Sequence, residues 1–332
     1  MDVRSSAIFI AQNAQYVSVD PAACREVAAG IYDQIQRQKY STQTWATHEL
    51  NQRCKLLDTE GQVDWVFTVD TLNFSFWSDR ETSERYTVEY NGKKYTGYWS
   101  LCAAINRALD EGIPVTTPAF WRSDEFNLEA CAHIFRSCTA EQIPLLDQRL
   151  AVLKEAGAAL ANTAFSDVLR SCNCSASRLL DWVTTNLQSY NDRFVYRNMK
   201  VSILKRAQIL VGELWACFNG EGLGRFDDID NITMFADYRV PRILYRLNCL
   251  RYSDQLEAVL RAGTLMESGS DAEIELRGTS IEAVEQIVHH IKTEHPETAV
   301  NAILVDFYLW DAAKAQEQSA TIPCHRVRSV FY

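Results

Sequence analysis

The chain has 332 residues, and 47% of them are hydrophobic, so it can bury a large core in one domain or in two closely associated ones. Its 33 basic and 43 acidic residues give a net charge of −10 at pH 7. That balance argues against a protein that grips a nucleic-acid backbone, because such proteins need basic surface to displace the counterions of the phosphates. No apolar run approaches the length of a membrane span.

The amino-terminal sequence and the distribution of the cysteines indicate the cellular compartment in which the protein is found. The apolar core of the amino-terminal stretch runs only from Ala7 to Ala11, too short for a signal sequence. We therefore expect a cytoplasmic protein, with the nucleus as the other compartment open to it. The ten cysteines are scattered, so reduced thiols are expected. Cys172 and Cys174 form the only close pair, and no second Cys or His pair stands at zinc-site spacing, so no metal site is predicted.

The first strong helix signal begins at Asp20. This residue is a good N-cap, Pro21 suits the first helical position, and an apolar stripe at helical spacing runs from Cys24 to Ile35. The pattern predicts one helix that ends at about Gln38.

Residues 65–99 form the exception to the helical pattern. Trp65–Val69 and Thr87–Tyr90 are rich in β-forming residues, and Asn91-Gly92 before Lys93 is a strong signal for a type I′ hairpin. We expect a small sheet packed against helices.

Amphipathic runs with helical periodicity fill the remainder of the chain. They are Leu101–Leu109, Leu145–Leu160, Ala176–Leu187, Ile203–Phe218, Val240–Leu250, Asp254–Leu260, Ile281–Ile291 and Ala299–Ala313. The predicted fold is therefore mainly α, with no linker or repeat that divides it. We expect a single compact unit over residues 1–332, which could be built from two sub-lobes with the active site between them.

The most informative stretch is residues 226–241, FDDIDNITMFADYRVP, because it places one carboxylate among aromatic and basic neighbours. Asp237 follows Phe235 and precedes Tyr238 and Arg239. Such a setting suits a partly desolvated carboxylate held by a cation, which is common at functional sites. The alternative is a structural ion pair between Asp237 and Arg239.

Three other segments mix aromatic and polar residues in the same way. They are LNFSFW (residues 72–77), DFYLWD (306–311) and HRVRSVFY (325–332). Together with FADYRVP, with WATHELN at Trp45 and with LKRAQILVGELW from Leu204, they make the chain resemble the queuosine salvage family. The resemblance runs from Trp45 to Tyr332. It departs from the family pattern at Arg242, where a neutral residue is favoured after the proline.

The resemblance implies a compact, helical, glycosylase-like fold and a hydrolase. Members of the family are queuosine 5′-phosphate N-glycosylases, which release the base queuine for salvage into tRNA modification. It implies a small nucleotide substrate, queuine as product, water as the only cosubstrate and no cofactor. Stable binding to nucleic acid or to a membrane is not expected.

Cleavage of an N-glycosidic bond passes through an oxocarbenium-like sugar, which a nearby carboxylate stabilises. Asp237 is the candidate catalytic residue, as nucleophile, base or electrostatic stabiliser. The leaving 7-deazaguanine lacks the N7 lone pair, so help must come from contacts elsewhere on the base. The candidate substrate contacts are His48, Asn73, Phe74, Trp77, Phe235, Tyr238, Arg239, Asp306, Trp310 and Asp311. The candidate phosphate contacts are Lys205, His325 and Arg326.

Structural explanations compete for several of these residues. A lone histidine beside a tryptophan, such as His48, is more often structural. Asn73, Phe74 and Trp77 can be a strand end that fills the core, and alternation makes Phe76 the more probable core residue. On a helix, Tyr308 and Trp310 cannot share a face, and Trp310 is preferred because it lies four residues after Asp306.

Two other functions fit the pattern. A DNA-repair-like N-glycosylase would also carry an aspartate after helices, although the acidic balance argues against it. A non-catalytic protein that carries queuine or its nucleotide would bind the ligand without turnover.

Overall fold

The structure is a computed structural model that describes residues 1–316 and 321–332. Over these ranges the chain is mainly helical, as predicted, and its strands form only two-stranded antiparallel pairs. The chain divides into two compact units, residues 1–41, 192–208 and 229–332 in the first and residues 42–191 and 209–228 in the second. No helix of the described ranges is both long and apolar enough to span a membrane.

The first unit contains six whole α-helices within the described residues and four strands. The helices are α1 (Val3–Asn13), α2 (Pro21–Gln38), α13 (Val240–Arg246), α14 (Asp254–Arg261), α15 (Asp271–Glu294) and α16 (Ala302–Ala315). The strands are β1 (Val17–Val19), β4 (Arg193–Tyr196), β5 (Met199–Ser202) and β6 (Leu250–Tyr252). Helix α12 (Lys205–Cys217) begins in this unit and continues in the second.

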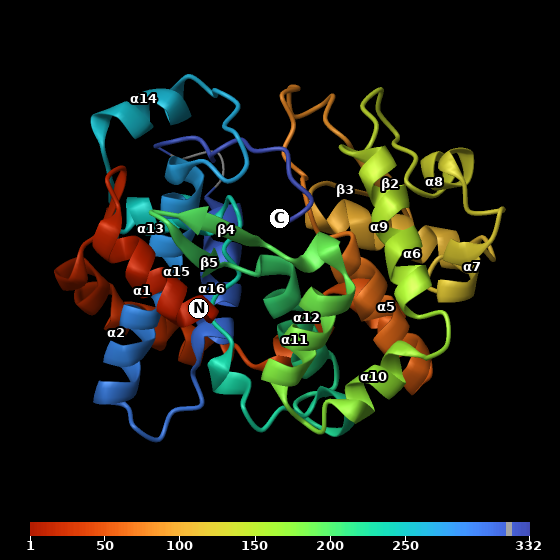
Figure 1. The fold of residues 1–332 in the computed structure, drawn as a ribbon, viewed down its shortest axis with the longest axis horizontal. Helices are drawn as coiled ribbons and strands as arrows, with labels where there is room; N and C mark the ends of the chain where they lie inside the picture. Colours follow the sequence, from red (N-terminus) through yellow and green to blue (C-terminus); the bar gives the residue numbers. More distant parts are fainter. Residues whose placement is uncertain (317–320) are drawn as a thin grey trace. The chain divides into compact units, whose positions relative to one another are not determined.

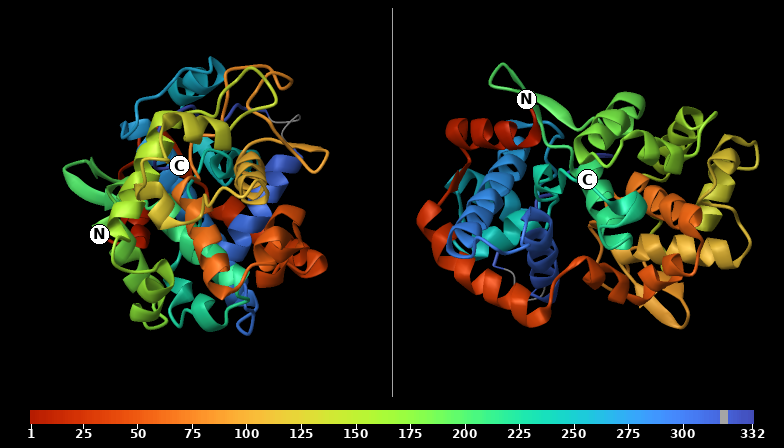
Figure 2. Two further views of the ribbon diagram at one scale, coloured as in Figure 1. Left: turned by 90° about the vertical axis from the view of Figure 1, so that its right-hand side faces the viewer. Right: turned by 90° about the horizontal axis from the view of Figure 1, so that it is seen from below.

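Helix α15 is the centre of the first unit and packs against α1, α2, α13 and α16 (Figures 1 and 2). The close approach of α1 depends on Gly278, since a Cβ atom there would lie 2.6 Å from Ile10 Cδ1. Ile10 belongs to a fully buried cluster with Tyr196, Val201 and Ile274. This core supports the helix from which several buried polar side chains project.

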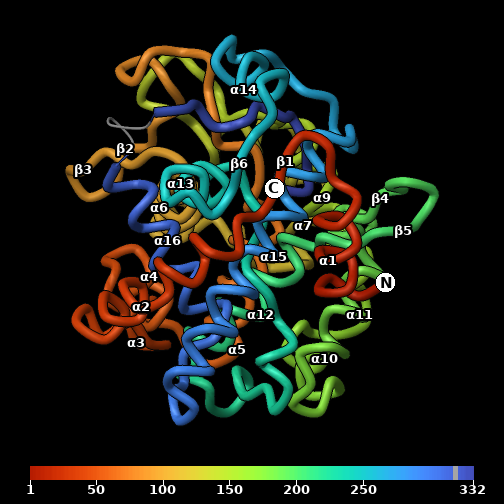
Figure 3. Tube along the Cα trace, turned by 90° about the vertical axis from the view of Figure 1, so that its left-hand side faces the viewer, coloured from red at the N-terminus to blue at the C-terminus, as the bar shows by residue number. Residues whose placement is uncertain are grey.

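Two antiparallel strand pairs complete the first unit. Strand β1 pairs with β6, and Val17 lies opposite Tyr252 (Figure 3). Strands β4 and β5 form a hairpin in which Tyr196 lies opposite Met199.

The second unit is also helical. Its helices are α3 (Thr42–Thr47), α4 (Glu49–Lys55), α5 (Thr59–Thr71), α6 (Tyr98–Asp110), α7 (Pro118–Arg122), α8 (Leu128–Ile134), α9 (Leu146–Ala159), α10 (Phe165–Ser171) and α11 (Ala176–Asn186). Its strands are β2 (Val88–Tyr90) and β3 (Lys93–Tyr95).

The predicted hairpin is confirmed, whereas the predicted strand Trp65–Val69 is wrong. Strands β2 and β3 are joined by Asn91 and Gly92, whose φ angles of 51° and 74° are those of a type I′ turn. Residues 65–69 instead lie in helix α5, in which every residue from Trp65 to Thr71 is buried. A helix that is surrounded by protein carries apolar residues without helical periodicity, so its short apolar run resembles a strand.

Most predicted helices are present, and their ends are the least accurate part of the prediction. The predicted helix Val240–Leu250 ends at Arg246, and Leu250 belongs to β6. The predicted helix Ile281–Ile291 is the second half of α15. Helix α16 begins after Asn301, whose side chain caps it by accepting the N–H of Leu304 at 3.1 Å.

Candidate active site

The candidate residues fall in both units. The first unit contains Lys205, Phe235, Asp237, Tyr238, Arg239, Asp306, Trp310, Asp311, His325 and Arg326, and the second contains His48, Asn73, Phe74 and Trp77.

Asp237 lies in an irregular segment, residues 232–239, directly before α13, and only 8% of its surface is exposed. Its Oδ1 atom accepts hydrogen bonds from the backbone N–H groups of Arg239 (2.7 Å) and Val240 (3.0 Å). A carboxylate is favoured here because the first N–H groups of a helix lack carbonyl partners. Asp237 therefore contacts the backbone of Arg239, and one carboxylate oxygen is enough to fix the side chain.

The backbone of residues 232–239 is held by buried side chains from three helices, Gln208 on α12, Asp306 on α16 and Arg277 on α15. Gln208 Oε1 accepts the N–H of Thr233 at 2.9 Å. Asp306 Oδ1 accepts the N–H of Phe235 at 3.0 Å. Arg277 Nε donates to the carbonyl directly before Asp237 at 2.9 Å. A loop held at three successive points presents its carboxylate rigidly.

Asp306 is 3% exposed and faces two other acids. Burial raises the pKa of its carboxyl well above the usual value, and the charges of Asp237 and Asp311 raise it further. The N–H of Phe235 and the ammonium of Lys205 act in the opposite direction. The first unit thus brings an anchored carboxylate close to a carboxyl group that favours its protonated form.

Aromatic and basic side chains lie beside these acids. The Arg239 guanidinium lies over two rings, 5.8 Å from the centroid of Tyr238 and 5.7 Å from that of Trp310. Burial raises the pKa of Tyr238. Asp311 accepts the hydroxyl of Tyr40 at 2.6 Å. The helical position of Trp310 is as predicted.

The three candidate phosphate contacts differ in their surroundings. Lys205 is 5% exposed and close enough to Asp306 to lower its pKa. His325 is buried, its Nε2 atom lies 3.0 Å from the hydroxyl of Tyr332, and burial lowers its pKa to about 3, with a further contribution from Arg277. Arg326 is part-buried and donates to the carbonyl of Gly263 at 3.4 Å. The phosphate contacts of Lys205, His325 and Arg326 stay predictions.

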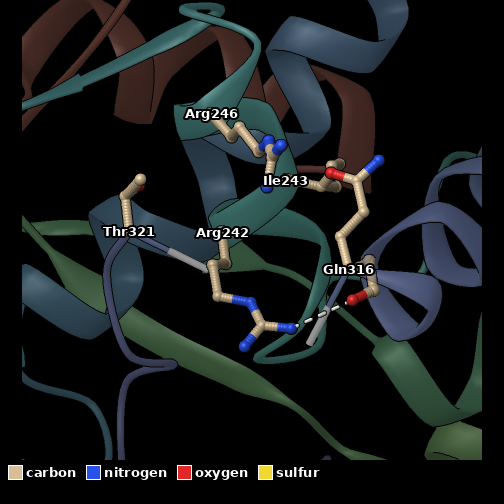
Figure 4. Close-up of a pocket in the computed structure, with 6 residues that line it drawn as sticks. Arg242, Ile243, Arg246, Gln316 and Thr321 are labelled. Carbon is tan, nitrogen blue, oxygen red and sulfur yellow. Dashed lines mark hydrogen bonds between the residues drawn. The ribbon is translucent and has the colours of Figure 1, made fainter. Parts of the chain in front are cut away.

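A small hollow in the first unit lies elsewhere (Figure 4). It is lined by Arg242, Ile243, Arg246, Ala313, Gln316 and Thr321. Arg242 donates to the carbonyl of Ala313, near the carboxyl end of α16, at 3.1 Å. A guanidinium at the end of a helix binds carbonyls that lack N–H partners, so this arginine has a structural explanation.

In the second unit, His48 is the N-cap of α4. Its Nδ1 atom accepts the N–H of Leu50 at 3.3 Å, and its ring stacks on Trp99 with the centroids 3.4 Å apart and the planes within 5°. An Nδ1 atom that accepts requires the proton of the neutral ring to be on Nε2. His48 therefore has a fixed ring plane and an Nε2–H donor.

The segment that contains Asn73, Phe74 and Trp77 follows α5 and is not a strand. Arg149, which is fully buried, donates to the carbonyls of Leu72 and Phe74, each at 2.6 Å. Its guanidinium also lies 4.4 Å from the centroid of the Phe74 ring.

The expectation that Phe76 is the core residue of this segment is wrong. The fully buried ring is that of Phe74, and Phe76 is only partly buried. Strand alternation does not apply to this segment, because Ser75 adopts a positive φ of 56°. Asn73 is buried and donates to Asp70 at 3.1 Å, and Trp77 keeps partly exposed surface.

No group of three or more metal-binding side chains with suitable geometry occurs among residues 1–316 and 321–332. The sites described here are composed of carboxyl, amide, aromatic and basic groups.

Comparison with known proteins assigns the chain to a family. A family model described as "Queuosine salvage protein" matches residues 54–332. The chain belongs to the queuosine salvage protein family. A Schizosaccharomyces pombe protein named queuosine 5′-phosphate N-glycosylase/hydrolase is 43% identical, and the match covers 99% of each chain.

Two further relatives of the queuosine salvage family carry the same name. The Nematostella vectensis protein is 41% identical over 99% of this chain and 98% of its own length. The Sphaerobacter thermophilus protein is 34% identical over 97% and 95%, respectively. The match therefore spans both units.

Sequence reasoning missed the residues that support Asp237. Gln208 and Arg277 are 0% exposed and hold the Asp237 segment, yet neither was a candidate. Arg277 could have been found from Glu273 four residues earlier, because the two charges lie on one face of a helix beside Ile274 and Leu276. Charges at such spacing within an apolar run indicate a buried pair.

Proposed function

We propose that the chain is an N-glycosylase that hydrolyses queuosine 5′-phosphate and releases queuine for salvage. In this reaction the bond between C1′ and the base nitrogen breaks, the oxygen of water bonds to C1′, and the base nitrogen gains a proton. The products are queuine and ribose 5-phosphate. Membership in the queuosine salvage family and the names of the relatives support this reaction.

The observation that carries the proposal is the way Asp237 is held. Its Oδ1 atom is engaged by two backbone N–H groups. The side chain cannot swing away, so its charge stays fixed while positive charge develops at C1′. A preorganised carboxylate stabilises an oxocarbenium-like transition state without the cost of reorganisation.

Asp306 supplies the second part of the proposal. A carboxyl group that retains its proton donates a hydrogen bond, and a 7-deazaguanine needs such contacts because it has no N7 lone pair to protonate. The raised pKa of Asp306 and its burial beside Asp237 support this role. Phe235 precedes Asp237 in the same segment, and Asp311 lies on the same helix as Asp306.

The remaining candidates enter the proposal as substrate contacts to be tested singly. In the first unit these are Tyr238, Arg239 and Trp310, whose rings and guanidinium lie against one another, with Lys205 and Arg326 as cations for the 5′-phosphate. In the second unit they are His48, Asn73 and Trp77. Phe74 has no exposed surface, so we assign it a supporting role under its neighbours.

The deciding experiment incubates the purified protein with queuosine 5′-phosphate and follows free queuine by chromatography and mass spectrometry. Asp237→Asn keeps an oxygen that can accept the two backbone N–H groups but removes the charge. We expect release by the wild type and a loss of several orders of magnitude in kcat for this variant. The matched control is Asp33→Asn, the same change at an exposed position of α2.

Two results would overturn the proposal. If neither protein releases base although both bind the nucleotide, the chain is a carrier. If Asp237→Asn releases queuine at the rate of the Asp33→Asn control, another group performs the catalysis.

A further inference from the structure

Arg277 projects from the middle of α15 and is 0% exposed. Its Nη1 and Nη2 atoms bind the two carboxylate oxygens of Asp192 at 3.0 and 2.6 Å, and Nη1 also lies 3.2 Å from Glu273 Oε1. Its Nε atom donates to the carbonyl of Ala236 at 2.9 Å. The guanidinium therefore joins a buried acidic pair to the residue directly before Asp237.

The face of this guanidinium is covered by an aromatic ring. The Tyr332 ring lies 3.9 Å from Arg277 Cζ, and the Tyr332 hydroxyl lies 3.0 Å from His325 Nε2. Burial opposes the charge of Arg277, but Asp192 and Glu273 outweigh it and raise the pKa of the guanidinium. Arg277 is thus a permanent cation with a fixed plane and a fixed position.

Neutralising Asp192 and Glu273 requires only a positive charge, whereas holding Ala236 requires a donor at the Nε position. A lysine ammonium supplies the charge as a point, without the planar fork. The two tasks of Arg277 can therefore be separated by substitution.

We infer that Arg277 is a positioning residue for the reaction, because its Nε–H group fixes the carbonyl of Ala236 and thereby the placement of the Asp237 carboxylate. This inference rests on the proposed function. We assign Arg277 no contact with the substrate, because it acts through Asp237. Asp192, Glu273 and the Tyr332 ring hold the guanidinium in turn.

The test compares Arg277→Lys with Tyr196→Phe in the queuine-release assay. Tyr196 is buried and its hydroxyl contacts Glu275 of the same helix at 2.9 Å, so Tyr196→Phe disturbs α15 without touching Ala236. For each protein, kcat and KM are measured, and kcat is corrected for the folded fraction from a thermal unfolding curve.

We expect Arg277→Lys to lower kcat by roughly 10- to 100-fold per folded molecule, with KM within about twofold of the wild type, since a misplacement of about 1 Å can cost that much in rate. Tyr196→Phe should retain the wild-type kcat. A kcat of Arg277→Lys equal to that of Tyr196→Phe would overturn the inference, because the arginine would then serve only to balance charge.

A second pair of variants keeps the inference testable if Arg277→Lys fails to fold. Tyr332→Leu removes the ring from Arg277, and Tyr332→Phe keeps the ring but loses the hydroxyl. We expect a kcat loss of about 3- to 10-fold, at unchanged KM, for Tyr332→Leu, which loses about 1 kcal/mol of ring contact. Equal kcat values for both variants would count against the inference, whereas absence of queuine release by the wild type would instead contradict the proposed function.

Discussion

The two units each contain an irregular segment that is anchored by one buried arginine, but the two arginines bind different groups. Arg277 binds the carbonyl of Ala236 together with the carboxylates of Asp192 and Glu273. Arg149 binds the carbonyls of Leu72, Phe74 and Pro144 and lies over the rings of Phe74 and Phe76. The contacts of Arg277 thus include two carboxyl groups, whereas those of Arg149 include three carbonyls and two aromatic rings.

The difference follows from what each arginine has to hold. Leu72 is the C-cap residue of α5, where carbonyls at the negative end of the helix dipole attract a cation. Ala236 precedes α13, near a helix amino terminus whose dipole repels a cation, so carboxylates are needed to retain Arg277 there. We infer that Arg149 stabilises its unit, whereas Arg277 positions a charged group.

The largest effect on stability is expected at Arg149. Arg149→Lys retains the charge but cannot reproduce the fork that reaches three carbonyls, and each buried acceptor left without a partner costs about 1–3 kcal/mol. We expect a loss of about 2–4 kcal/mol in the free energy of unfolding, measured with urea, compared with the smaller loss expected for Arg277→Lys.

The control for this comparison is Arg170→Lys, which makes the same change at an arginine that is 50% exposed and pairs with Glu60. Exposed ion pairs contribute little, so its free energy of unfolding should change by less than about 1 kcal/mol. A loss at Arg277 as large as that at Arg149 would remove the distinction between the two arginines.

The next largest effect on stability is expected at His325, which contacts the hydroxyl of Tyr332. Its pKa is lowered to about 3 by burial and by Arg277, below the ordinary value of 6.5. The unfolded chain therefore binds more protons between these values, so stability falls as the pH drops from 6.5 towards 3. The wild type should therefore lose free energy of unfolding as the pH falls. We expect this loss to be smaller in His325→Gln by on the order of 2–4 kcal/mol. The glutamine can still bond to Tyr332.

Urea unfolding at pH 7 and at pH 4 measures this difference. His289→Gln, at an exposed position of α15, is the matched control and should keep the pH dependence of the wild type. If the free energy of unfolding falls as much in His325→Gln as in the wild type between pH 7 and pH 4, the His325 ring gains its proton without disturbing Arg277 and Tyr332.

The sequence predicted much of the fold because secondary structure leaves local patterns, and a local pattern also made Asp237 the candidate catalytic residue. Asp20-Pro21 and Asn91-Gly92 define a helix start and a turn within two residues, and the structure confirms both. Asp237 stays a prediction, which rests on its aromatic and basic neighbours in the sequence. The second half of helix α5, from Trp65 to Thr71, has no exposed face, so it lacks helical periodicity and its sequence predicts a strand at Trp65–Val69.

The residues that hold the Asp237 segment could not be predicted from the sequence in the same way. Arg277 and Ala236 are 41 residues apart in sequence, and Arg277 and Asp192 are 85 apart. Contacts over such separations depend on the path of the chain and leave no local signature. His325 shows a related difference, since its basic segment predicts a phosphate contact, whereas the structure buries the ring, and burial and Arg277 lower its pKa to about 3.

The smallest effect on stability is expected at Asp306, and its sign is opposite to that of His325. Burial and the charge of Asp237 raise the pKa of Asp306 above its ordinary value of 3.8. Above pH 3.8 the folded chain retains a proton that the unfolded chain has released, so stability falls as the pH rises from there to the raised pKa.

Asp306→Asn has no charge to bury and can still accept the N–H of Phe235. We expect it to be more stable than the wild type by about 1 kcal/mol at pH 7.5 and equally stable near pH 3, in urea unfolding at both values. Its queuine release should stay close to the wild-type rate, because the Nδ2 amide of asparagine still donates a hydrogen bond where the protonated carboxyl does. Lower stability at pH 7.5 would show that Asp306 is ionised and held by Lys205, and the acid beside Asp237 would then be a second carboxylate.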